Sequence, residues 1–146
     1  MMRRVTLRVL LGGALGLALL LTACGSGELL NDAYTAAGDG TRLQDVTKTT
    51  TFRHDDDLNV VIVLNAHSRE LEVGAVFNAP DGAVYGTDTL EADETVGEVL
   101  LGLDWESQNG AAWAAGEWTV DVQIDENTEK TLRFTVAGVP DASAEG

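Results

Sequence analysis

The sequence is poor in the residue types from which most catalytic and metal sites are built. Its 146 residues include one cysteine and two histidines. A single cysteine excludes an intramolecular disulfide, and two histidines without a free cysteine form a poor ligand set for transition metals. The sequence also lacks a Gly-x-Ser-x-Gly elbow and a glycine-rich phosphate loop. These absences argue against a serine hydrolase of that class and against phosphate-loop nucleotide binding.

Basic residues are also scarce. The chain has 9 Lys and Arg against 24 Asp and Glu, and three of the basic residues, Arg3, Arg4 and Arg8, precede Cys24. Without the segment before Cys24, 9 − 3 = 6 basic residues face 24 acidic ones, a formal charge of −18. Such a surface repels phosphate backbones, so we expect no nucleic-acid partner.

No apolar run is long enough for a typical membrane-spanning helix, which needs about 20 residues. Residues 1–8 are basic, and residues 9–21 are apolar with three glycines. A charged start followed by a short apolar run is typical of a secretory signal. We therefore expect residues 1–23 to be a signal peptide that is cleaved between Ala23 and Cys24.

The residues at this boundary resemble the lipobox of bacterial lipoproteins. Leu21, Thr22, Ala23 and Cys24 match its pattern of an aliphatic residue, two small residues and cysteine. The resemblance implies diacylglycerol on the Cys24 thiol and an N-acyl chain (palmitate or similar) on the new amino terminus. It implies an exported protein held at the extracytoplasmic face of the cell or outer membrane, with the lipid bilayer as a partner.

Glycine and polar residues at both ends predict less regular structure there. We expect residues 24–44 to form the lipidated cysteine and a tether, with a short helix over residues 28–37 that ends at Gly38. Residues 138–146 are small and polar and predict a flexible tail. The folded domain is then expected over residues 45–137.

Alternating apolar and polar residues dominate this domain, which is typical of half-buried strands. The expected strands are residues 59–65, 71–78, 99–105, 118–125 and 131–136, with weaker candidates at 47–53 and 83–90. About seven consecutive strands without crossover helices must pair antiparallel, and their apolar faces need a second sheet. The sequence predicts an all-β sandwich of the immunoglobulin-like (Ig-like) or fibronectin-like class, with a small β-barrel as the competing fold.

The end of the domain carries a second resemblance. Residues 116–122 (GEWTVDV) and 132–136 (LRFTV) are similar to the closing hairpin of bacterial Ig-like modules. The cysteine pair of antibody domains is absent. The resemblance implies a module stabilised by packing alone.

Two groups of residues are candidates for binding. Asp55, Asp57 and Asn59 have the spacing that opens a calcium loop, but Val60 and Ala66 replace its glycine and glutamate, which excludes an EF-hand. A looser calcium site, helped by Glu91, Asp93 or Glu94, remains an alternative to a solvated turn. Partner contacts are expected in the loops around residues 54–57, 80–86 and 107–116, with His54, Tyr85 and Trp113 as candidates. For Trp113 the alternative is packing over the end of the sandwich.

We find no catalytic constellation. Ser68 lies beside His67, but both fall in an expected turn. The sequence therefore predicts a non-enzymatic binding or structural module of the cell envelope that contacts an envelope protein. The alternatives are a metal-dependent hydrolase, a calcium-binding module and an inhibitor of an exported protease.

Overall fold

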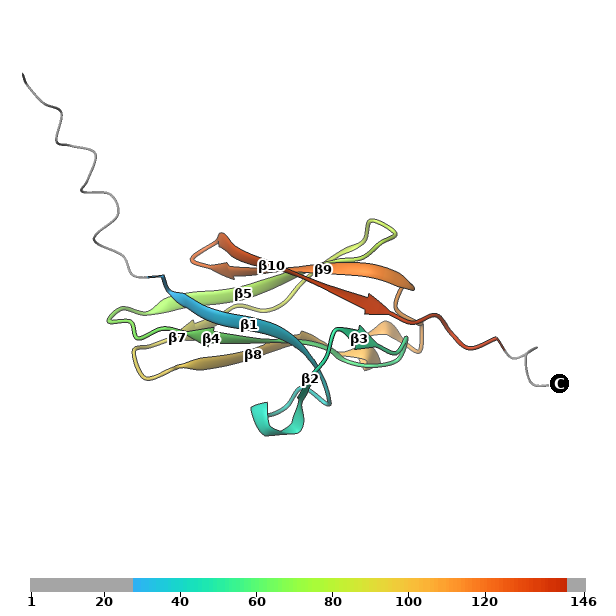
Figure 1. Ribbon diagram of the computed structural model, residues 1–146, viewed down its shortest axis with the longest axis horizontal. Coiled ribbons are helices and arrows are strands. Elements are labelled where there is room, and N and C mark those ends of the chain that lie inside the picture. The colour runs from blue at the N-terminus through green and yellow to red at the C-terminus, as the bar shows by residue number, and fades with distance from the viewer. Residues whose placement is uncertain (1–27, 142–146) are drawn as a thin grey trace, which may run out of the picture.

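The computed structural model describes residues 28–141, which fold into two stacked β-sheets (Figure 1). The first sheet has the order β2-β1-β4-β8 and the second has the order β3-β10-β9-β5-β6, with β7 also paired to β5. The strands are β1 (Leu30–Ala37), β2 (Thr47–Lys48), β3 (Thr51–Phe52), β4 (Leu58–Leu64), β5 (Leu71–Asn78), β6 (Val84–Gly86), β7 (Leu90–Ala92), β8 (Glu98–Leu103), β9 (Gly116–Ile124) and β10 (Asn127–Val136). Two short 3₁₀ helices, η2 (Leu43–Asp45) and η3 (Trp105–Gln108), lie in the connections.

The strand order confirms the Ig-like sandwich. The first, second and fourth long strands (β1, β4 and β8) share one sheet, whereas the third, fifth and sixth (β5, β9 and β10) share the other. This division is that of Ig domains. All strand pairs within residues 28–141 are antiparallel except β3 with β10. The described strands form two separate sheets, so the barrel alternative is wrong.

The core lies between the two sheets and follows the alternation of the sequence. The inward residues of β9 and β5 are almost completely buried: Trp118, Val120, Val122 and Ile124 from β9, and Leu71, Val73, Ala75 and Phe77 from β5. Six aromatic rings pack together toward one end of this core: Phe52, Phe77, Tyr85, Trp113, Trp118 and Phe134. With no disulfide available, this packing supplies the main stabilisation.

The helix expected over residues 28–37 is wrong, because Leu30–Ala37 is strand β1. It pairs with β4, where Tyr34 lies opposite Val61 and Ala36 opposite Asn59. Leu, Ala and Asn permit a helix, but an apolar central strand such as β4 needs a partner on each edge, and tertiary pairing overrides weak propensity. The folded domain therefore begins at Leu30, inside the range expected to be a tether.

Gly102 in β8 makes room for a buried amide on the outer face of the first sheet. Asn59 is 3% exposed, and its Nδ2 donates to the Gly38 carbonyl at 3.1 Å. A Cβ on Gly102 would collide with Asn59 Oδ1 and lie 2.7 Å from the Leu58 carbonyl oxygen.

Gly102→Ala should therefore lower the free energy of unfolding by about 1–3 kcal/mol, as overpacking does. Urea denaturation would measure the loss. Gly86→Ala is the matched control, because its Cβ would meet nothing within 4 Å. Equal stability of the two variants would contradict the packing described for Asn59.

Candidate functional site

The three loops expected to contact a partner meet at one end of the sandwich. Trp113 N donates to the His54 carbonyl at 3.0 Å, and a Cβ on Gly116 would lie 3.2 Å from the Pro80 side chain. Figure 1 shows that this end lies opposite the start of β1. We call it the far end.

Of the two expectations for Trp113, packing over the end of the sandwich is confirmed, and contact with a partner is wrong. The residue is 3% exposed, and its Nε1 donates to the Asp56 carbonyl at 2.7 Å. Its ring packs edge-on against Tyr85 and Trp118, with centroids 5.5 and 5.9 Å apart. Trp113 therefore closes the end of the core. The half-buried Tyr85 ring belongs to the same aromatic packing, because it stacks on Trp118 with centroids 5.8 Å apart. His54 stays half-buried in the loop.

A polar hollow of about 380 Å³ opens at the far end. We call it the acidic hollow, because six of its lining residues are acidic; the lining consists of Gly38, Asp39, Asp55, Asp56, Asp57, Asp104, Trp105 and Glu106. The residues come from the connection after β1, the turn before β4 and helix η3 after β8. The antiparallel pairing of β1, β4 and β8 brings these three connections to the same edge of the first sheet.

Electrostatic repulsion is concentrated at Asp57. Partial burial raises the pKa of its carboxyl group, and the charges of Asp104 and Glu106 raise it further, against one hydrogen bond from the Trp105 N–H at 2.8 Å. Asp55 Oδ1 is enclosed, and the nearby Arg53 Nε lies 3.3 Å away on a largely exposed side chain. A cationic group entering the hollow would relieve this repulsion, so the arrangement favours a basic ligand.

Trp105 is the aromatic residue at the hollow, and the sequence interpretation missed it. Trp105 was expected to be the last residue of the strand over residues 99–105, but β8 ends at Leu103 and Trp105 begins η3. Asp104 caps this helix by accepting from Glu106 N at 2.9 Å, and Trp105 Nε1 donates to the Ala111 carbonyl at 3.0 Å. The half-buried indole is thus fixed at the edge of the hollow. An aspartate followed closely by Glu and Ser was the available sign of a helix start.

The calcium prediction gains no support from the described side chains. Asp55 and Asp57 line the acidic hollow, whereas Asn59 lies in an adjoining hollow and bonds to Gly38. Within residues 28–141, no three His, Cys, Asp or Glu side chains converge closely enough to hold an ion. Glu91, in β7, pairs with the start of β5 at the opposite end, so the expected help from it and its neighbours Asp93 and Glu94 is wrong.

His67 lies at that opposite end and is held by two carbonyl groups. Its Nδ1 is 3.0 Å from the Asn65 oxygen, and its Nε2 is 2.7 Å from the Asp93 oxygen. These contacts, Asn65 first, raise the pKa of the imidazole because only the protonated ring donates from both nitrogens. A ring held in this way is not free to act as the base for Ser68.

The free energy of unfolding should therefore fall as the pH rises through the pKa of His67 in the folded state. A raised pKa means that its stabilisation is complete below 6.5, the ordinary value, and is lost as pH rises through the higher folded-state value. Urea midpoints measured from pH 6 upward should decline, and His67→Ala should flatten this decline. His54→Ala is the matched histidine control and leaves the His67 contacts in place. An unchanged slope in His67→Ala would refute the assignment.

The predicted lipidation site lies outside the described residues, as do the signal peptide and the cleavage point after Ala23. Within residues 28–141, no helix has the length and apolar character needed to cross a bilayer.

Comparisons with known proteins give likenesses of shape. No protein-family model and no curated protein sequence matches this chain. An immunoglobulin-like protein from Pseudomonas aeruginosa is similar in structure at 12% identity and a TM-score of 0.48, over 78% of this chain and 98% of that one. An alkylpurine DNA glycosylase from Pseudomonas fluorescens, bound to DNA with an abasic site analogue, gives 10% identity and a TM-score of 0.39, over 61% of this chain and 28% of its own. The Ig-like fold of this chain rests on its own strand order.

Proposed function

We propose that this chain is a cell-envelope lipoprotein, anchored through acylated Cys24, whose Ig-like domain is a non-catalytic binding module for a basic protein partner. The observation that carries the binding role is the acidic hollow with Trp105 at its edge, located at the far end.

An anchor at Cys24 and a binding site at the far end would lie at opposite ends of the domain. Cys24 precedes Leu30, the first residue of β1, by six residues. An extended chain of that length spans at most about 20 Å, so the end where β1 begins would stay close to the bilayer. The far end would then point away from the membrane surface, where a partner protein can reach it.

The chemistry of the hollow favours lysine or arginine side chains. Asp57 and its acidic neighbours supply carboxylates for charge-assisted hydrogen bonds, and the half-buried Trp105 indole offers a flat surface for a guanidinium group. Tryptophan at the centre of an interface often carries much of the binding energy. The large negative charge of the domain would also speed encounter with a basic partner.

Trp105→Ala should reduce capture of the partner at least about tenfold, because truncation of one hot-spot tryptophan typically weakens binding by at least that much. The chain would be crosslinked in intact cells with a photo-reactive residue at Glu106, and the recovered partner compared with wild type. The thermal midpoint should change little, because Trp105 lies outside the buried core. Leu90→Ala is the control, since Leu90 is 40% exposed and lies at the opposite end. Equal capture by both variants, or capture that survives high salt, would contradict the proposal.

A further inference from the structure

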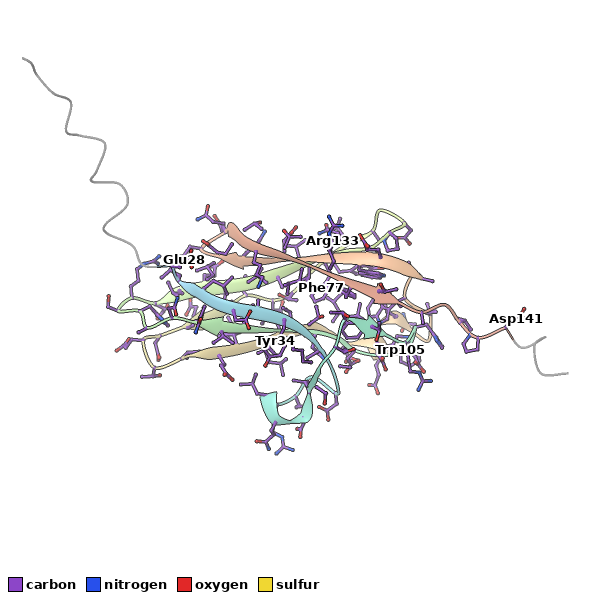
Figure 2. All side chains as sticks on the ribbon, viewed as in Figure 1. Glu28, Tyr34, Phe77, Trp105, Arg133 and Asp141 are labelled. Atoms are coloured by element: carbon purple, nitrogen blue, oxygen red, sulfur yellow. The ribbon has the colours of Figure 1, made fainter. Side chains whose placement is uncertain are left out.

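A second hollow lies on the side of the sandwich, between β1 and β10, whose ribbons run along the same side in Figure 1. We call it the side groove; it has a volume of about 210 Å³, and its lining includes Asp32, Tyr34, Lys48, Lys130, Leu132 and Arg133. Figure 2 labels Tyr34 on β1 and Arg133 on β10.

The side groove is basic on an otherwise acidic domain. Three of the six basic residues that follow Cys24 line it: Lys48, Lys130 and Arg133. Its lining has one acidic side chain, Asp32, which pairs with Lys130 at 3.4 Å. Lys48 Nζ lies 5.2 Å from the centre of the Tyr34 ring. Arg133 also pairs with Glu117, outside the lining, at 3.3 Å. The lining still carries more basic than acidic side chains, so an anionic ligand is attracted more strongly here than at the acidic hollow.

The backbone of β10 is open along this groove. Its edge away from β9 pairs with β3 at Thr135 and Val136, where Thr135 N donates to the Thr50 carbonyl at 2.9 Å. Backbone groups alternate along a strand, so the N–H groups of Thr131 and Arg133 point to the same edge. Within residues 28–141, no strand pairs with that edge before Thr135.

We propose that the side groove binds an extended acidic peptide segment of a partner protein, which pairs with the open edge of β10 in line with β3. This inference rests on the proposed function of the domain as a binding module and adds a second surface to it. Strand addition supplies the main-chain hydrogen bonds, and the side chains supply the specificity. Arg133 points to the outer face of β10, whereas Lys130 and Leu132 point to the inner face. An alternating peptide is therefore expected to place carboxylates near Arg133 on the outer face, and to place its other side chains near Leu132 and Lys130 on the inner face.

The test uses the full-length chain, purified from expressing cells with a carboxyl-terminal tag, and a fluorescent peptide of four Glu-Val repeats. Lys130→Glu combined with Arg133→Glu should weaken binding at least about tenfold, because two attractive charges become repulsive. The control is Arg42→Glu combined with Arg53→Glu, which changes the net charge equally at two other ion-paired arginines. It should change the affinity less than about threefold, since non-specific charge effects at exposed sites are small.

The backbone contact is tested at Thr131. Thr131→Pro removes the open N–H and should weaken peptide binding, whereas Thr131→Ala removes the same hydroxyl bond to Asp121 but keeps the N–H and should not. Amide NMR shifts should move at Thr131 and Arg133. Equal weakening by the two double variants, or equal weakening by Thr131→Pro and Thr131→Ala, would overturn the proposal.

The two proposals fail separately. Trp105→Ala should leave peptide binding unchanged, because Trp105 lies at the far end and not in the side groove. If the peptide does not bind while Trp105-dependent capture persists, the side groove is not a binding surface and the far-end function stands. If capture fails while the peptide binds as described, the far-end function is wrong and the side groove stands.

Discussion

A chain with Cys24→Ser should carry no acyl groups and should leave the membrane fraction or keep its leader. Thiolate is the nucleophile that lipid transfer requires, and serine does not replace it at neutral pH. Each buried methylene contributes about 0.8 kcal/mol, so any chain that has lost its leader and lacks the two or three acyl chains should leave the membrane fraction almost completely.

Intact mass and palmitate labelling of the chain recovered from cells would measure this change. Ser26→Ala, two residues beyond the cysteine, is the matched control and should remain acylated and membrane-bound. A free thiol on the wild-type chain would remove the anchor from the proposed function, while the Ig-like domain and its two hollows would remain as described.

Trp118→Ala should lower the free energy of unfolding by about 3–5 kcal/mol, the range for a buried aromatic residue. Trp118 is fully buried, and its ring stacks between Tyr85 and Phe134 with centroids 5.8 Å from each. The substitution also leaves the Ala114 carbonyl without the indole N–H that donates to it at 2.8 Å. In a domain without disulfides, such a loss is a large part of the total stability.

Urea denaturation would measure the effect. Trp118→Phe should lose less, because it retains a ring in the stack and gives up the hydrogen bond and part of the volume. Trp105→Ala should lose least, because its side chain is half-exposed. The opposite order would mean that the aromatic cluster is not the centre of the core.

Most strands could be predicted from the sequence because apolar and polar residues alternate along them, which marks one buried and one exposed face. In β9, Trp118, Val120, Val122 and Ile124 alternate with polar residues, and a strand with one buried face leaves little freedom in its register. Strand β1 could not be predicted this way. Its pattern mixes Asn, Asp and Thr with alanines, and the buried Thr35 hydroxyl group donates a hydrogen bond to the Thr49 carbonyl, far from it in sequence. That environment exists only after the chain has folded.

The candidate site was predictable in place but not in composition. The sequence indicated three loops as candidates for partner contact, and the structure places them together at one end. It could not tell which tryptophan is exposed, because neither the alanines on both sides of Trp113 nor the acidic residues on both sides of Trp105 determine burial. Their burial depends on hydrogen bonds across the end of the sandwich, such as Trp113 to Asp56 over 57 positions.

The long axis of the domain also defines a distance. Strand β10 has ten residues, which at about 3.4 Å each gives roughly 34 Å from one end of the sandwich to the other. With Cys24 in lipid, Trp105 would stay in a layer within about 50 Å of the lipid headgroups, because the linker adds at most about 20 Å to the length of the domain. Confinement to such a layer raises the effective concentration of any partner located in it and excludes partners beyond it. Inserting residues between Gly27 and Leu30 would widen that layer without touching the binding surface.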